Sequence, residues 1–262
     1  MEAVCKICNS KLFVHDTSLV LNKHSVTYYY CSHCGFVQTE EPYWLEEAYS
    51  KAIATADTGI ISRNLKNAND LLYFIHFIHC QNEICMDFGG GHGILTRIMR
   101  DYGFDFYHYD KYANNLYAQG FEANMNNKYK LITAYENFEH FTTPLIEIEK
   151  LMRITDVLFF STSLVSSPPP LIKDWWYYSP STGQHISFYT LKTLQVIADK
   201  FDCQLLSDNS DLHILSKSPI RKNFFEKLRA YNKIRNKLDI TGKFKQKSKI
   251  WDDYLAVTDS IR

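Results

Sequence analysis

The 262-residue sequence predicts an α/β fold: a mostly parallel sheet with one antiparallel strand and helices on both faces, preceded by a small metal-binding ribbon. Three observations predict this fold. Strand-like and helix-like patterns alternate through most of the chain. The last two strand-like runs flank the polar segment Asp208–Asp211, which is typical of a hairpin turn and reverses one strand. Two Cys-x-x-Cys pairs lie near the N-terminus.

The predicted elements follow one another along the chain. Apolar residues recur at helical spacing over Asn64–His79, which predicts a helix. The short apolar run Ile84–Phe88 ends at glycines and predicts a strand, and a helix follows over Ile94–Tyr102. The remaining predicted elements are strands over Phe104–Tyr109, Tyr129–Ala134 and Asp156–Ser161, a helix over Leu191–Phe201, and a hairpin of Cys203–Ser207 with Leu212–Ser216.

The composition excludes several classes of protein. Hydrophobic residues make up 45% and charged residues 22% of the chain, as in an ordinary globular protein. The formal net charge is +0, so a general nucleic-acid binder is not expected. The N-terminus lacks the basic and apolar segments of a signal peptide, and no run of about 18 apolar residues is present. We therefore expect a cytoplasmic protein without a membrane span.

The two cysteine pairs, Cys5-x-x-Cys8 and Cys31-x-x-Cys34, are separated by 22 residues. Each pair can present two thiolates to one ion, and zinc favours four such ligands in a tetrahedron. The alternatives are two disulfides or free core thiols, but a reducing compartment favours zinc. Because four cysteines fill every ligand position, the predicted site is structural, and His33 between two ligands is a bystander. The other cysteines, Cys80, Cys85 and Cys203, fall in predicted core elements.

The sequence thus divides into a zinc-binding module over residues 1–41, an α/β domain over 42–218 and a basic, helical C-terminal extension over 219–262. The extension has 11 basic residues between Arg221 and Lys249, and its apolar side chains recur at helical spacing. We favour a packed or dimerising helix there. Contact with an anionic glycan carrier or nucleotide is the alternative.

A glycine-rich turn follows the first predicted strand of the α/β domain. Asp87 ends the strand, and Gly89, Gly91 and Gly93 stand at alternate positions, where a backbone without side chains can pass close to a ligand. Asp110 ends the next strand, 23 residues after Asp87, and an acid there can accept two hydrogen bonds from ribose hydroxyls. This predicts a nucleoside-cofactor site. NAD is the competing ligand, but its G-x-G-x-x-G fingerprint fits less well.

The segment from Asp87 to Gly93 resembles the first motif of class I S-adenosylmethionine (SAM)-dependent methyltransferases. From Cys5 to about Lys217 the chain resembles bacterial methyltransferases with an N-terminal zinc module, many of them encoded with surface-polysaccharide or deoxysugar genes. Cys-Gly-Phe at 34–36 and the aromatic segment at 175–185 also carry this resemblance. It implies a Rossmann-like class I fold with a zinc ribbon, SAM as cofactor, and a small-molecule or nucleotide-linked sugar or glycan acceptor.

The resemblance also bears on the atom methylated. The larger sugar C-methyltransferases of this kind have a further C-terminal domain that this sequence does not contain, so we expect O-methylation. Composition and architecture also resemble enzymes of enteric-pathogen capsule gene clusters, where one candidate substrate is the O-methyl phosphoramidate decoration. The expected role is therefore O-methylation of a sugar or sugar-linked group in capsule or surface-polysaccharide biosynthesis.

A polar cluster, Glu136-Asn-Phe-Glu139-His140, follows the strand that ends near Ala134. It resembles the Glu-x-x-Glu-His of ubiquinone-pathway and small-RNA O-methyltransferases. In some of those enzymes, the acids and the histidine, with a later histidine, hold a divalent cation on the substrate hydroxyls. His185 is the later histidine here, so Glu136, Glu139, His140 and His185 are the predicted catalytic residues and the ligands of a tentative Mg²⁺ or Mn²⁺ site. The alternative is metal-free, with His140 or His185 as general base.

Two other functions remain open at this point. The chain can be an RNA or protein methyltransferase whose zinc module binds the macromolecule, although the neutral charge argues against nucleic acid. A non-catalytic SAM-binding protein is the third option. Labelled SAM offered with nucleotide sugars or with tRNA distinguishes them.

Overall fold

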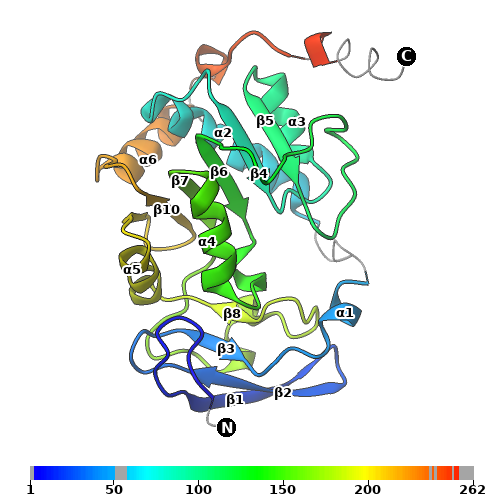
Figure 1. Ribbon diagram of the computed structural model, residues 1–262, viewed down its shortest axis with the longest axis vertical. Coiled ribbons are helices and arrows are strands. Elements are labelled where there is room, and N and C mark those ends of the chain that lie inside the picture. The colour runs from blue at the N-terminus through cyan, green and yellow to red at the C-terminus, as the bar shows by residue number, and fades with distance from the viewer. Residues whose placement is uncertain (1–2, 51–57, 236–237, 239–240, 250, 254–262) are drawn as a thin grey trace. The chain divides into compact units, whose positions relative to one another are not determined.

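The computed structural model describes residues 3–50, 58–235, 238, 241–249 and 251–253 (Figure 1). The chain divides into two compact units. The first comprises Met1–Ala54, Ala134–Arg153 and Leu158–Ser218, and the second Thr55–Thr133, Ile154–Val157 and Pro219–Arg262. Among the described residues, no helix is both long and apolar enough to cross a membrane.

The N-terminal sheet of the first unit is antiparallel and has four strands in the order β1-β2-β3-β8 (Figure 1). Strands β1 (Phe13–Val20), β2 (His24–Tyr30) and β3 (Val37–Thr39) lie within the predicted module. Strand β8 (Ser187–Phe188) comes from about 150 residues later and pairs with β3. Buried Tyr28 and Phe188, from β2 and β8, belong to the same apolar core, so the ribbon shares its core with the later part of the chain.

The second sheet has six strands in the order β5-β4-β6-β7-β10-β9. Strand β4 pairs in parallel with β5 and β6, and β10 pairs antiparallel with β9. The prediction of a Rossmann-like α/β sheet that is mostly parallel with one antiparallel pairing is confirmed. The strands are β4 (Ile84–Phe88), β5 (Asp105–Tyr109), β6 (Leu131–Tyr135), β7 (Val157–Ser161), β9 (Gln204–Ser207) and β10 (Leu212–Ser216).

Three helices of the second unit pack together. Helix α2 (Ile60–Phe77) lies against α3 (Ile94–Asp101) and against α6 (Phe224–Arg235) of the basic extension. Tyr73 of α2 stacks on Tyr231 of α6, with ring centroids 4.9 Å apart, so the apolar spacing of the extension buries one helix face against its own chain. A 3₁₀ turn, η4 (Thr241–Phe244), follows. Of the extension predicted as helical, residues 236–237, 239–240, 250 and 254–262 lie outside the described residues.

The first unit holds helices α1 (Leu45–Ala48), α4 (Pro144–Ile154) and α5 (Leu191–Lys200). Thr190 is the N-cap of helix α5. Its hydroxyl accepts from the Thr193 amide, and the Thr193 hydroxyl accepts from the Thr190 amide, so the two residues cap the helix reciprocally. Helix α4 was not predicted. Its signal is Pro144 in the first turn, where the missing amide hydrogen costs nothing. Three 3₁₀ turns complete the unit: η1 (Phe138–His140), η2 (Ile172–Asp174) and η3 (Trp176–Tyr178).

Candidate functional site

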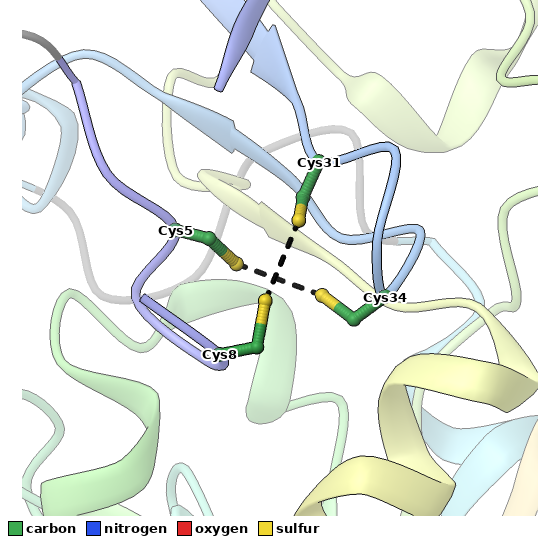
Figure 2. A group of neighbouring side chains, drawn as sticks. All are labelled: Cys5, Cys8, Cys31 and Cys34. Atoms are coloured by element: carbon green, nitrogen blue, oxygen red, sulfur yellow. Dashed lines mark hydrogen bonds between the residues drawn. The ribbon is translucent and has the colours of Figure 1, made fainter. Parts of the chain in front are cut away.

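The four cysteines of the predicted zinc site come together in the first unit, with their sulfur atoms turned toward a common centre (Figure 2). Cys5 Sγ lies 3.6 Å from Cys34 Sγ, and Cys8 Sγ lies 3.5 Å from Cys31 Sγ. All four sulfurs lie within 4.8 Å of one another. A hydrogen bond from Cys34 lowers the pKa of the Cys5 thiol to about 5. We call these four residues the cysteine cluster.

The cysteine cluster fits a zinc ion. Sulfur ligands about 2.3 Å from a tetrahedral zinc lie about 3.8 Å apart, close to the two sulfur–sulfur distances in the protein. The backbone supports the second pair, because the Gly35 amide donates to the Cys31 carbonyl and the Cys31 amide donates to the Phe36 carbonyl. Gly35 has a φ of +83°, which favours glycine.

The glycine-rich loop links β4 to α3 in the second unit. Gly89, Gly91 and Gly93 all have positive φ values, of +65°, +58° and +86°. A Cβ atom added at Gly91 would meet no protein atom within 4 Å, so this position borders open space. At Gly93 an added Cβ would lie 2.5 Å from Asn115 Oδ1. The half-buried loop therefore leaves open space at Gly91, where a nucleoside cofactor can approach the backbone.

Gly90 was missed by the sequence reasoning, which singled out the alternate glycines. A Cβ atom at Gly90 would lie 2.5 Å from Asp87 Oδ2 and 2.9 Å from the His108 ring. Asp87 is buried, and its Oδ1 accepts a 2.8 Å hydrogen bond from the Thr133 hydroxyl. Burial raises the pKa of Asp87 to about 7, an effect that the hydrogen bond partly offsets. Gly90 thus lets the loop pass over a carboxylate that the protein itself buries.

Asp110 ties the loop to the segment after β5. Its Oδ2 accepts from the Gly91 amide at 2.9 Å, and its Oδ1 accepts from the Tyr112 and Ala113 amides, each at 2.7 Å. A carboxylate offers about four lone-pair sites, so the three amides leave about one for a ligand. The sequence predicts that this residue accepts two hydrogen bonds from a ribose. The structure adds that it also shapes the loop.

The first unit, which holds the cysteine cluster, also holds a group of three polar residues: Glu139, His140 and His185. We call this group the Glu–His cluster. Its ligand atoms lie within 4.8 Å of one another. Glu139 is fully buried, and neither of its carboxylate oxygens has a hydrogen-bond partner. Burial, and then the charge of Glu136, raise the pKa of Glu139 well above its usual value. The nearby hydroxyls of Tyr177 and Thr162 lower the pKa of Glu139, but neither makes a hydrogen bond of normal geometry to its carboxyl oxygens.

Backbone carbonyls orient both histidines of the Glu–His cluster. His140 Nδ1 lies 3.0 Å from the Gln184 carbonyl, and His185 Nδ1 lies 2.6 Å from the Tyr177 carbonyl. The Tyr49 hydroxyl also lies 3.0 Å from His140 Nδ1. Because a carbonyl only accepts, we assign the proton to each Nδ1, which leaves a lone pair on each Nε2. Burial lowers the pKa of His140 to about 3 and that of His185 to about 4. The two histidines and the Glu139 carboxyl group thus bring their ligand atoms within 4.8 Å of one another, and neither carboxyl oxygen makes a hydrogen bond.

The structure brings together three of the four residues predicted for this cluster. Glu136 has a φ of +52°, and its carboxylate accepts a 2.5 Å hydrogen bond from the Ser161 hydroxyl. The Ser161 hydroxyl in turn accepts from the Glu136 amide. This reciprocal pair holds Glu136, which does not belong to the group of described residues that could share an ion.

The side chains of the aromatic segment at 175–185 divide between the interior and the surface. Tyr177 and Tyr178 are buried, while Trp176 is 78% exposed. The Tyr177 ring lies 4.8 Å from the His185 ring and 5.4 Å from the Trp176 ring. Trp176 therefore presents an open aromatic face next to a residue that packs on the Glu–His cluster.

Comparison with solved structures finds several similar folds. The O-methyltransferase family protein of Burkholderia thailandensis aligns with a TM-score of 0.46 and 12% identity, covering 68% of each chain. Magnesium protoporphyrin IX methyltransferase of Synechocystis PCC 6803 gives 0.42 and 10%, covering 66% of this chain and 94% of its own. CalO1, a methyltransferase of calicheamicin biosynthesis, gives 0.40 and 9%, covering 62% of this chain; the present chain spans 59% of its length.

No curated protein sequence matches the chain. The family model for the methyltransferase domain matches residues 61–208, which is more than half of the 262 residues. The match begins in α2, contains the glycine-rich loop, Asp110 and the Glu–His cluster, and ends just after β9. The chain therefore belongs to the methyltransferase-domain family.

Proposed function

We propose that the protein is a SAM-dependent O-methyltransferase that acts on a hydroxyl group of a small, sugar-containing acceptor. The Glu–His cluster is the observation that carries the O-methylation. A buried carboxylate without a hydrogen-bond partner is costly, and it faces two imidazole nitrogens that carry no proton. An acceptor hydroxyl can donate a hydrogen bond to this group. Alternatively, a cation bound by the group can hold the acceptor hydroxyl.

The cofactor assignment rests on the glycine-rich loop of a methyltransferase-domain chain. When bound, SAM supplies an electrophilic methyl group on a sulfonium sulfur. The open space at Gly91 and the remaining lone pair of Asp110 suit a nucleoside laid along the loop. Asp87 and Gly90 support the conformation of the loop. Asp87 is buried under it, and Gly90 has no side chain that would collide with the Asp87 carboxylate.

Removal of the acceptor proton is assigned to the Glu–His cluster. His140 Nε2 or His185 Nε2 can accept the hydroxyl proton directly, because both nitrogens are unprotonated. Alternatively, Glu139, His140 and His185 would hold a divalent cation, which lowers the pKa of a bound hydroxyl. Two imidazoles with one carboxylate suit Mn²⁺ or another transition metal better than Mg²⁺. In either case the charge of Glu139 would stabilise the protonated histidine or the cation.

The acceptor class is argued from the surroundings of the Glu–His cluster. The exposed face of Trp176 can stack on the apolar face of a sugar ring. A sugar also offers the hydroxyl groups that the cluster is built to receive. The N-terminal sheet is completed by β8 and shares its core with it, which favours a structural role over macromolecule binding. A nucleotide-linked sugar or a sugar phosphoramidate of a surface polysaccharide is the substrate we propose.

Transfer of a labelled methyl group from SAM to a panel of nucleotide sugars tests the proposal, with tRNA as the contrasting acceptor. We expect label in a sugar and none in tRNA. His140→Ala and His185→Ala should each lower turnover by about 10²–10⁴-fold and still bind SAM. His24→Ala, which removes a histidine of the N-terminal sheet, is the matched control and should keep full turnover.

Each result separates one part of the proposal from the others. Label in tRNA alone would replace the sugar acceptor by RNA. Full turnover in both histidine variants, measured with the labelled acceptor, would show that the Glu–His cluster is only structural. Loss of turnover on chelation, restored by Mn²⁺ in the wild type, would select the cation route over direct proton transfer.

A further inference from the structure

The Cys34–Gly35 turn of the cysteine cluster lies directly against the start of helix α5. The carbonyl of Cys34 accepts hydrogen bonds from the Thr190 hydroxyl at 3.1 Å and from the Thr193 hydroxyl at 2.9 Å, and both threonines are buried. A Cβ atom at Gly35 would lie 2.6 Å from Thr190 Oγ1. The turn and the helix start therefore fit each other without spare room.

A ladder of backbone hydrogen bonds continues from the same module to the Glu–His cluster. The Thr39 amide, at the end of β3, donates to the Ile186 carbonyl at 3.1 Å. The Ile186 amide donates to the Glu139 carbonyl at 2.8 Å. Strand β8 then continues this pairing through Ser187, which lies opposite Gln38, and the Ser187 hydroxyl donates to the Phe141 carbonyl.

His185 lies two residues before strand β8, and the Thr190–Thr193 cap follows β8 closely. The β3–β8 pairing and the cap, which holds the Cys34 carbonyl, therefore both fix the segment directly after His185. Only four residues separate His185 from Thr190, so movement of the Cys34 turn cannot be absorbed over a long loop. A four-cysteine site contributes to folding through the free energy of metal binding, so loss of the metal removes that contribution.

We propose that the cysteine cluster is the positioning device of the Glu–His cluster, with Thr193 as the positioning residue that links the two. Metal held by the four cysteines fixes the Cys34 carbonyl, which fixes the start of α5 and the 185–188 segment. Loss of that metal releases His185 from Glu139 and His140. The assignment of the Glu–His cluster to catalysis rests on the proposed function, whereas the positioning itself does not.

Hydrogen–deuterium exchange on the full chain tests the link without an acceptor or turnover. Zinc-loaded protein is compared with protein stripped by a chelator. We expect amide protection in the peptide spanning 185–193 to fall on the order of tenfold or more on stripping, together with that of 31–39. Protection in the glycine-rich loop, 87–93, should stay unchanged. Undiminished protection of 185–193 in protein that has lost its zinc would overturn the proposal.

A pair of variants isolates the link while every cysteine and every member of the Glu–His cluster stays in place. Thr193→Val removes the hydroxyl that donates to the Cys34 carbonyl and accepts from the Thr190 amide, and Thr193→Ser keeps both bonds. In zinc-loaded protein we expect the valine variant to expose the Ile186 amide and to lower kcat while KM for SAM is kept. The serine variant should restore both readings. Equal exchange at Ile186 in the two variants would overturn the role of Thr193, whatever acceptor the enzyme uses.

Discussion

At the scale of single residues, Asp110 has more than one task. Three backbone amides, of Gly91, Tyr112 and Ala113, donate to its two carboxylate oxygens. The spacing of acids in the sequence identified Asp110 as a candidate cofactor ligand. It could not show that the side chain also holds the glycine-rich loop, because that depends on where two separate backbone segments meet.

Substitution of Asp110 should therefore affect the loop as well as the cofactor. We expect Asp110→Ala to weaken SAM binding by roughly 1–3 kcal/mol, because hydrogen bonds to a partly buried charge are lost. Asp110→Asn should lose less, since its amide oxygen can still accept from Tyr112 and Ala113. Calorimetric titration with SAM measures both effects. Wild-type affinity in the alanine variant would remove Asp110 from the cofactor site.

Asp87 predicts a pH dependence of stability. Its pKa is about 7 in the folded protein, against an ordinary value of 3.8, so the folded state binds more protons between these values. The free energy of unfolding should therefore fall as pH rises from about 4 to 7, because the unfolded chain loses the Asp87 proton in this range while the folded protein keeps it. Asp87→Asn cannot titrate, and its amide oxygen can still accept from Thr133.

The thermal unfolding midpoints of wild type and Asp87→Asn at pH 5 and pH 8 check this prediction. Contributions from all other titrating groups are shared and cancel in the difference between the two proteins. The asparagine variant should gain stability relative to wild type as pH rises. A difference that is the same at both pH values would mean that Asp87 is ionised throughout the range.

At the scale of elements, the N-terminal ribbon contacts both β8 and the start of α5. The ribbon sheet takes β8 as its fourth strand, and the α5 cap holds the Cys34 carbonyl. The two cysteine pairs and their spacing predicted four ligands in the sequence, and the structure brings all four sulfurs together. Strand β8 could not be predicted, because Ser187–Phe188 is too short to show a period and its partner β3 is far away in the sequence.

The cysteine cluster predicts one zinc ion per chain. Metal analysis of protein purified without added zinc measures the ratio. Cys31→Ser should lose the metal and lower the free energy of unfolding by several kcal/mol, because a closed metal site contributes directly to folding. Cys203→Ser makes the same chemical change at a cysteine outside the cluster and should keep the metal. Folded wild-type protein with a ratio near zero would contradict the zinc assignment.

At the scale of the whole molecule, features that depend on local sequence patterns were predicted better than features that depend on contacts between distant segments. Each strand predicted from Ile84 onward is present, because a buried strand flanked by turn residues leaves a clear signal. Helix α4 was missed, and Glu136 was predicted to join Glu139 and His140 in one cluster. The 3₁₀ turn begins at Phe138, and Glu136 is instead drawn to Ser161 of β7, a partner that spacing alone does not indicate. The division at residues 41 and 218 stays a prediction.

The most direct test of the central claim uses Gly91. Its φ of +58° suits asparagine better than other side chains, and an added Cβ meets no protein atom, so Gly91→Asn should fold. The new side chain would occupy the space that we assign to the cofactor. Calorimetric titration with S-adenosylhomocysteine should show binding to the wild type and at least about tenfold weaker binding to Gly91→Asn, a loss of about 1.4 kcal/mol, with thermal unfolding otherwise similar. Absence of binding to folded wild-type protein, or equal affinity in a folded variant, would contradict the assignment of this loop to SAM.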